Sequence, residues 1–160
     1  MDVKINTDNQ KFKFRVNCVI LDKERVLAVK IGQNDFYCCP GGHVHLGEDT
    51  YTAVMRETME EVGVEAKKQT LIAVMENFFG GENKHFHELS FYYLMEDAIF
   101  PEEKLHDYSY LENDEGKLVN LDFKWINLDD LDKFDFRPSN LKEILKSRDF
   151  SFHHIICKGQ

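Results

Sequence analysis

The chain has 160 residues, of which 42% are hydrophobic and 31% charged, and its formal net charge is −9. This length suits one domain, and we expect a single domain over residues 1–160 with its core at about 11–148. No stretch approaches the ~20 apolar residues of a membrane span and the N-terminus lacks the apolar core of a signal peptide, so we expect a cytoplasmic protein without a membrane partner. The negative charge argues against binding to duplex nucleic acid, which needs a basic surface.

Cysteine spacing gives no sign of a disulfide framework or a metal site. Cys18, Cys38, Cys39 and Cys157 form neither a CxxC pair nor a paired ligand spacing. We therefore expect reduced thiols.

The N-terminal part predicts a β-hairpin. Apolar and polar residues alternate over 11–21, a turn follows at 22–24, and 25–31 returns as the second arm. Arg15 and Lys30 lie on these arms and could reach a substrate phosphate if their faces look into a pocket. The alternative is that both are basic residues on a solvated strand face.

Residues 50–62 predict a helix. Asp49 or Thr50 can cap its first turn, and Gly63 can end it because glycine tolerates positive φ. Apolar residues recur at spacings of four, four and three, which predicts that the following residues form the buried stripe: Tyr51, Met55, Met59 and Val62.

Three acids occupy the same helix. Glu57, Glu60 and Glu61 stand at i, i+3 and i+4, where like charges repel by about 0.2–0.5 kcal/mol per pair. Arg56 compensates only part of this charge. Carboxylate oxygens suit a hard divalent cation, so the cluster indicates a site for Mg²⁺ or Mn²⁺, with a solvated acidic helix face as the alternative.

A glycine-rich turn precedes the helix. Gly41 and Gly42 permit a sharp bend and a close approach of the backbone to a ligand, and Glu48 adds a carboxylate near the start of the helix. The turn and the acids together predict a pocket for a metal-bound diphosphate.

The stretch 42–64 resembles the signature of the Nudix hydrolases, G-x5-E-x7-R-E-U-x-E-E-x-G-U. Only Thr58 departs from it, at a position where an aliphatic residue is commoner. The remaining positions of the signature are occupied by Gly42, Glu48, Arg56, Glu57, Glu60, Glu61, Gly63 and Val64.

This resemblance implies an α/β/α sandwich with a mixed β-sheet between helices, and attack of water on a nucleoside diphosphate linked to another moiety. It implies that Mg²⁺ or Mn²⁺ is held by Glu57, Glu60, Glu61 and Glu48. Arg56 would orient the neighbouring glutamates, and the backbone at Gly41 and Gly42 would approach metal and phosphate. A nucleotide-sensing module without catalysis is the alternative, and dimers are frequent in the family.

The second half of the chain predicts a long hairpin, 71–79 with 86–96. Family members often use a further glutamate outside the signature as metal ligand or base, and Glu88 is the best candidate for it. The carboxylate that takes the proton of the attacking water could be Glu60, Glu61 or Glu88. An exposed strand residue is the alternative for Glu88. The downstream markers of several Nudix branches are missing, which favours a nucleoside triphosphate or another nucleotide derivative.

The remaining segments give structural expectations only. Residues 97–120 are acidic and poorly periodic, which predicts a surface loop. A strand at 121–127 and an amphipathic helix at 138–147 should follow, and the tail from Phe150 carries no functional signal.

Overall fold

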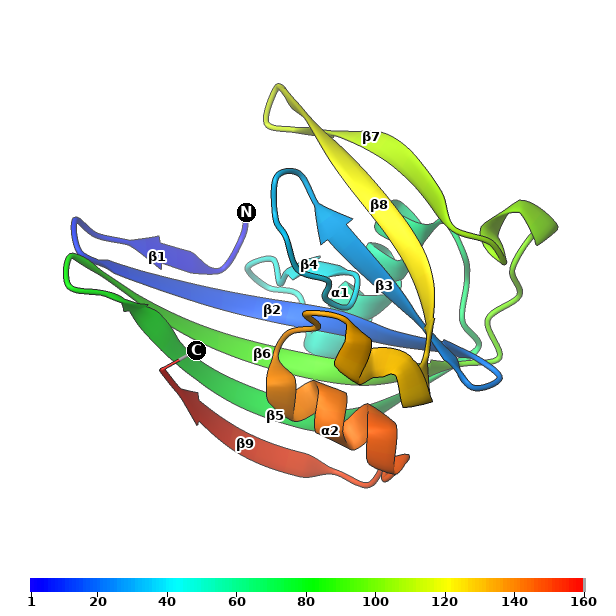
Figure 1. Cartoon of the computed structure of the whole chain (residues 1–160). Helices are drawn as coiled ribbons and strands as arrows, with labels where there is room; N and C mark the ends of the chain where they lie inside the picture. Colours follow the sequence, from blue (N-terminus) through cyan, green and yellow to red (C-terminus); the bar gives the residue numbers. More distant parts are fainter. Residues whose placement is uncertain (160) are drawn as a thin grey trace.

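A mixed nine-stranded sheet organises the computed structural model, which describes residues 1–159 (Figure 1). Its main path runs β7-β8-β3-β2-β6-β5-β9, and β1 and β4 each pair with β2. The strands are β1 (Lys4–Asn6), β2 (Gln10–Asp22), β3 (Arg25–Ile31), β4 (Gly41–His43), β5 (Lys68–Gly81), β6 (Lys84–Glu96), β7 (Tyr108–Asp114), β8 (Lys117–Asn127) and β9 (His153–Lys158). The helices are α1 (Thr50–Glu57), the π-helix η1 (Thr58–Val62), the 3₁₀ helices η2 (Glu102–Lys104) and η3 (Leu128–Lys133), and α2 (Ser139–Ser147).

The sheet carries a core on each face. Cys18 and Ile20 of β2 pack in the core that holds Val54 of α1. Val19, whose side chain points to the opposite side of the strand, packs in the core that holds Leu141 of α2. The fold is therefore the expected α/β/α sandwich with a mixed sheet between helices.

Strand β2 connects the site to the rest of the sheet. Along one edge it runs parallel to β6 from Gln10 to Ile20. Along the other edge its middle pairs with β4, with Arg15 opposite His43, and its end pairs with β3, with Leu21 opposite Val26. Because β3 and β4 pair with different parts of the same edge of β2, β3 separates from β2 where β4 begins to pair. Strand β4 carries the glycine turn to this point of separation.

Most predicted elements are confirmed. The strands expected at 11–21, 25–31, 71–79, 86–96 and 121–127 correspond to β2, β3, β5, β6 and β8, and the helix expected at 138–147 corresponds to α2. All four cysteines are free. Among residues 1–159, none of the helices combines the length and the apolar character that a membrane span requires.

The loop predicted at 97–120 is wrong. This stretch contains η2, all of β7 and the start of β8. Leu111 lies on the exposed face of β7, and Glu112 lies in register with the two tyrosines of the other face, so the apolar periodicity that marks a strand is weak. Its other face packs through Tyr108 and Tyr110, whose rings stack on Phe123 of β8.

The predicted buried stripe of the helix is also wrong. Tyr51 and Met59 are 52% and 50% exposed, whereas Ala53 and Val54 are fully buried. Small side chains on the inner face let α1 lie close to the sheet, so the larger apolar residues remain at its outer side. Of the predicted stripe, only Val62 is fully buried and Met55 is half-buried.

Strand pairing at Gly41 predicts a stability effect. A Cβ at this position would lie 2.2 Å from the carbonyl oxygen of Val16 and 2.9 Å from Cα of Asn17, both of which are backbone atoms. Gly41→Ala should therefore separate β4 from β2 and lower the free energy of unfolding by about 2 kcal/mol or more. Urea denaturation measures the effect.

Gly81→Ala is the matched control, since a Cβ there would meet nothing within 4 Å. It should change the free energy of unfolding by no more than about 0.5 kcal/mol. Equal stability of the two variants would contradict the close approach of β4 to β2.

Candidate active site

The helix that carries the acids changes its winding at Thr58. The carboxylate of Asp49 caps the start, accepting from the backbone N–H of Thr52 at 2.8 Å. At the end, the N–H of Gly63 (φ 74°) donates to the carbonyl of Thr58 at 3.0 Å, a π-type i to i+5 bond. The Thr58 hydroxyl donates to the Val54 carbonyl at 2.7 Å, a bond known to bend helices. The wider turn carries Glu61 to the buried side.

Two carboxylates lie directly against the glycine turn. The backbone N–H of Gly41 donates to Oε2 of Glu61 at 2.7 Å. A Cβ at Gly42 would lie between 2.3 and 2.5 Å from the carboxylate atoms of Glu57. Glycine is therefore required at position 42 for Glu57 to occupy this place.

Arg56 joins the remaining acids. Its Nε and Nη2 donate to the two carboxylate oxygens of Glu48 at 2.8 and 2.9 Å. Its Nη1 donates to Glu57 at 2.6 Å and to Glu60 at 3.1 Å, and Nη2 also reaches the carbonyl of His43 at 3.0 Å. One guanidinium thus contacts both Glu57 and Glu60.

The acids differ in their protonation. The hydrogen bonds from Arg56 lower the pKa of Glu48 to about 2, so Glu48 is ionised. Burial raises the pKa of Glu57, although Arg56 opposes the shift. Burial raises the pKa of Glu61 to about 8, although its bond from Gly41 opposes the shift, and Glu61 is only 6% exposed. Crowded, partly uncompensated acids of this kind favour a bound cation.

The donors suit Mg²⁺ or Mn²⁺ in their chemistry. Carboxylate oxygens are the ligands that these hard cations prefer, and Glu57 and Glu61 meet at the glycine turn. Within residues 1–159, no three His, Cys, Asp or Glu side chains already converge as a metal cluster. When a cation binds, the carboxylates of Glu57 and Glu60 would therefore either bind it while keeping their hydrogen bonds to Arg56 or give up those hydrogen bonds.

A cavity of about 350 Å³ opens on the α2 side of the sheet, and its polar lining includes Lys13, Arg15, Asn17, Asn77 and Glu88. Arg15 lies close enough to oppose the rise in pKa of both Glu57 and Glu61. Glu88 accepts from the Ser90 hydroxyl at 2.9 Å. Asn17 is 7% exposed, and its amide nitrogen has no hydrogen-bond partner in the part of the chain that the structure describes.

The predicted residues thus fall into two groups. Seven surround the glycine turn: Gly41, Gly42, Glu48, Arg56, Glu57, Glu60 and Glu61. Arg15 and Glu88 line the adjoining cavity. Lys30 joins neither group, because its ammonium lies over the Tyr37 ring, 5.0 Å from the centroid.

The structure adds residues that the sequence did not single out. The Tyr110 hydroxyl donates to the backbone carbonyl of Glu61, and the Lys104 ammonium donates to that of Val62. Glu112 shares the inner face of β7 with Tyr110, and its charge contributes to the raised pKa of Glu61. The alternation of Tyr108, Tyr110 and Glu112 was the available signal, hidden in a segment interpreted as a loop.

Comparison with known proteins agrees with this geometry. A sequence model of the NUDIX domain matches residues 11–146. The chain belongs to the Nudix hydrolase family. Hydrolysis of pyrophosphate linkages is the general activity of that family, so this protein is a hydrolase of that kind.

Solved structures share the fold at low sequence identity. The MutT protein of Bacillus halodurans superposes with a TM-score of 0.67 at 19% identity, covering 89% of this chain and 86% of the other. The MutT Nudix hydrolase of Burkholderia pseudomallei gives 0.57 at 22% identity, over 75% and 86%. A UDP-X diphosphatase gives 0.51 at 16% identity, over 89% and 66%. These likenesses support the fold.

The raised pKa of Glu61 predicts a pH-dependent stability difference. Folding raises this pKa from 4.5 to about 8, so the contribution of the group to stability is full below pH 4.5 and is lost as the pH rises through 8. Glutamine keeps an acceptor for the Gly41 amide but does not titrate. In chelator-treated protein, Glu61→Gln should therefore gain stability relative to wild type across this pH window.

Urea denaturation of both proteins with EDTA at several pH values tests this. Glu65→Gln is the control, since Glu65 is exposed and lies beyond the helix. A difference between wild type and Glu61→Gln that does not change with pH would contradict the burial of an acid at position 61.

Proposed function

We propose that this Nudix hydrolase uses Mg²⁺ or Mn²⁺ to cleave a nucleoside diphosphate linked to another moiety, with water attacking phosphorus. The observation that carries the proposal is the meeting of the Glu57 and Glu61 carboxylates with the backbone of Gly41 and Gly42. Acids placed there, beside a cavity that contains Arg15, suit a ligand that brings both a cation and phosphates.

Each of the four acids would contribute to cation binding in a different way. Glu57 and Glu60, already held together by Arg56, supply oxygens, and Glu61 can add one because only one of its oxygens is bonded to Gly41. Glu48 is fully engaged by Arg56 and the His45 amide, so it contributes by sharing an oxygen. The bound cation would neutralise phosphate charge and make water a stronger nucleophile.

A carboxylate must take the proton of the attacking water. Among Glu60, Glu61 and Glu88, we assign this role to Glu61, because a bound cation would ionise this acid and a buried carboxylate is a stronger base than an exposed one. Glu60 has a side chain that is 57% exposed and bonded to Arg56. Glu88 lies in the neighbouring cavity, where it can contact the rest of the substrate.

The cavity fits one nucleoside. Its volume of about 350 Å³ lies at the small end of known ligand pockets, roughly 300–1,000 Å³. Phe36, with the Arg137 guanidinium 4.3 Å from its ring centroid, gives an aromatic wall. Asn17 and Asn77, both more than nine-tenths buried, supply amides for a polar base edge. A nucleoside triphosphate or another nucleotide derivative meets these requirements.

A nucleotide sensor without catalysis is the second candidate. It would not need buried acids with raised pKa values, which cost folding free energy. Release of phosphate or pyrophosphate from a nucleotide panel, with Mg²⁺ and with chelator, separates the two.

Substitution of the acids tests the proposed chemistry. Glu60→Gln and Glu61→Gln should each lower kcat by a factor of about 10²–10⁴, because a ligand or a proton acceptor is lost while the shape is kept. Steady-state kinetics on the best nucleotide of the panel measure this. Glu65→Gln should match wild type, and wild-type rates in both site variants would refute the assignment.

Asn17 predicts a change in substrate binding without a loss of stability. Its amide nitrogen has no partner to lose, so Asn17→Ala should unfold at the wild-type urea concentration or above. A lost hydrogen bond to substrate, worth about 1–3 kcal/mol, should lower kcat/KM by about 5- to 150-fold. If kcat/KM stayed at the wild-type value for every nucleotide tested, the cavity would not be the nucleoside site.

A further inference from the structure

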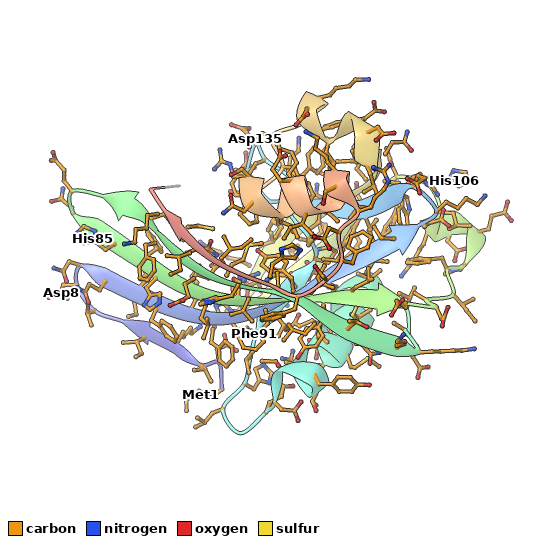
Figure 2. All side chains as sticks on the ribbon, turned by 90° about the horizontal axis from the view of Figure 1, so that it is seen from below. Met1, Asp8, His85, Phe91, His106 and Asp135 are labelled. Atoms are coloured by element: carbon orange, nitrogen blue, oxygen red, sulfur yellow. The ribbon has the colours of Figure 1, made fainter. Side chains whose placement is uncertain are left out.

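Helix α1 covers only part of its side of the sheet (Figure 1). The helix begins over β6, where the Thr50 hydroxyl lies 2.7 Å from the Tyr93 hydroxyl. From there toward the turn between β5 and β6, the strands β2, β6 and β5 continue beyond the helix. Figure 2 shows Phe91, two residues before Tyr93, on the side of the sheet opposite α2. A part of the sheet that faces the α1 side is therefore uncovered.

Burial differs between the two faces of these strands. On β6, Ser90 faces the α2 side and is fully buried, whereas Leu89 and Phe91 face the α1 side and are only half-buried. On β5, Asn77 faces the α2 side and is buried, whereas Phe78 is half-buried. Polar side chains are thus buried on one face while apolar side chains remain partly exposed on the other.

The apolar side chains on the uncovered side form one continuous surface, which we call the outer face. Residues paired across a sheet point to the same side, so the strand register identifies them. Ile5 and Ile156 stand at its two margins and are 61% and 57% exposed. A contiguous apolar surface of this kind marks an interaction site. The outer face consists of Ile5, Phe12, Phe14, Val74, Phe78, Leu89, Phe91 and Ile156.

The outer face carries little charge. Within residues 1–159, Glu76 is the one carboxylate that β2, β5, β6 and β9 direct to this side beyond the helix, and it lies 2.8 Å from Nε2 of His154. Two copies of a chain with a net charge of −9 repel each other. That repulsion is weakest where the facing surfaces lack free carboxylates, so the outer face is suited to a second copy.

The size of the outer face is that of a dimer interface. It spans the five strands β1, β2, β6, β5 and β9 in width and the stretch of β6 from His85 to Tyr93 in length. At about 4.8 Å per strand and 3.3 Å per residue, it covers roughly 600 Å² in plan. Side chains make the surface rougher than its plan, so its accessible area approaches the ~800 Å² that each partner buries in a standard interface.

The side chain of Tyr51 projects at one end of the outer face. Tyr51 lies in the first turn of α1 and is 52% exposed, although its place in the apolar stripe predicts burial. Helical spacing puts it on the flank of α1 away from Glu57 and Glu60. The Glu57 carboxylate lies against Gly42 of β4, at the other edge of β2, so Tyr51 is directed toward β6.

The other end of the outer face is hollow. A cavity of about 590 Å³ lies there. The His87 ring stacks on Phe78 with centroids 4.5 Å apart and meets the edge of Phe12 at 5.1 Å, so the cavity has an aromatic floor. The residues that line it from the α1 side are Ile5, Phe12, Phe78, His87 and Lys158.

The projection and the hollow fit each other in a twofold dimer. In such a dimer the same surface packs against itself. From Tyr93, below the start of α1, to His87 in the cavity is about 20 Å along β6. A twofold axis that crosses the strands midway, between Leu89 and Phe91, therefore brings Tyr51 of each copy over the cavity of the other. The same axis brings Phe91 opposite Leu89 of the second copy.

We infer that the protein forms a homodimer through the outer face, with Tyr51 of each copy in the cavity of the other and Phe91 against Leu89. The dimer explains why large apolar side chains of α1 and of the sheet are left uncovered in a single chain. It does not rest on the proposed function. Both candidate active sites stay accessible, because the cavity next to the acids opens on the α2 side.

Sedimentation velocity of the full chain tests the association. Wild type should be mostly dimeric at about 100 µM, since interfaces of standard size have micromolar or lower dissociation constants. Phe91→Lys and Leu89→Glu should each raise the dissociation constant at least about 100-fold, because each buries an unpaired charge. Tyr51→Ala should raise it about 10-fold or more, because an aromatic side chain leaves its pocket.

Leu118→Lys is the matched control, since Leu118 is 70% exposed on β8, outside the outer face. It should remain dimeric. A wild type that is monomeric at this concentration overturns the inference and leaves the outer face to a different partner. A Tyr51→Ala variant that associates as tightly as wild type overturns the placement of Tyr51 in the cavity. Melting temperatures close to wild type show that the variants are folded.

An equimolar mixture of Phe91→Lys and Leu89→Glu tests the geometry. In a mixed dimer the introduced ammonium at position 91 meets the introduced carboxylate at position 89, and the second contact between Phe91 and Leu89 stays native. The mixture should therefore associate within about 10-fold of wild type, although neither variant associates alone. A mixture that sediments as monomers, beside a dimeric wild type, overturns the twofold arrangement.

Nucleotide hydrolysis separates this inference from the proposed function. Phe91→Lys should hydrolyse the best nucleotide of the panel at the wild-type rate per chain, because the outer face contains none of the proposed ligands. A dimeric wild type without hydrolysis supports the inference and overturns the proposed function. Hydrolysis by a monomeric wild type overturns the inference and leaves the proposed function standing.

Discussion

The hydrogen bond from the Gly41 amide to the Glu61 carboxylate is the contact on which the rest of the site depends. It exists because residues 41 and 42 have no side chains, so that strand β4 can lie against β2 while two carboxylates lie against β4. Several other contacts hold the helix in the position that this bond needs. Asp49 fixes its start, the π-turn at Thr58 rotates Glu61 inward, and Tyr110 and Lys104 bind its last carbonyls.

The arrangement is electrostatically unfavourable in the free protein. Arg56 satisfies Glu48 and contacts Glu57 and Glu60, but Glu61 is buried without a cation of its own. Burying an uncompensated acid costs folding free energy, and binding of the proposed cation and phosphorylated ligand would recover that cost. The same acids that weaken the free protein are therefore those that would give the complex its affinity. The same helical turn therefore lowers the stability of the free protein and would bind its ligand.

The glycine turn and the helix were predictable from the sequence, because the signature between Gly42 and Val64 is shared by the family and specifies the local structure. The long strands were also predictable, since their apolar alternation reflects burial on a sheet. The buried face of the helix was not. Periodicity assigns large apolar residues to the core, whereas close packing on the sheet selected Ala53 and Val54, and the π-turn shifted every residue after Thr58.

Long-range contacts account for the remaining differences. Lys30 and Arg15 look alike in sequence, yet only Arg15 lies opposite β4 and lines the cavity, whereas the Lys30 ammonium lies over the Tyr37 ring. Strand β7 was missed because it carries Leu111 on its exposed face and Glu112 on its inner face, where Tyr110 donates to the backbone of Glu61.

Anomalous scattering from crystals grown with Mn²⁺ and a non-hydrolysable nucleotide tests the central claim most directly. We predict a manganese peak within coordination distance of Glu57 and Glu61, beside the Gly41–Gly42 backbone, with the phosphates touching the same ion. A nucleotide bound elsewhere, with the two carboxylates turned to solvent and no peak between them, would contradict it.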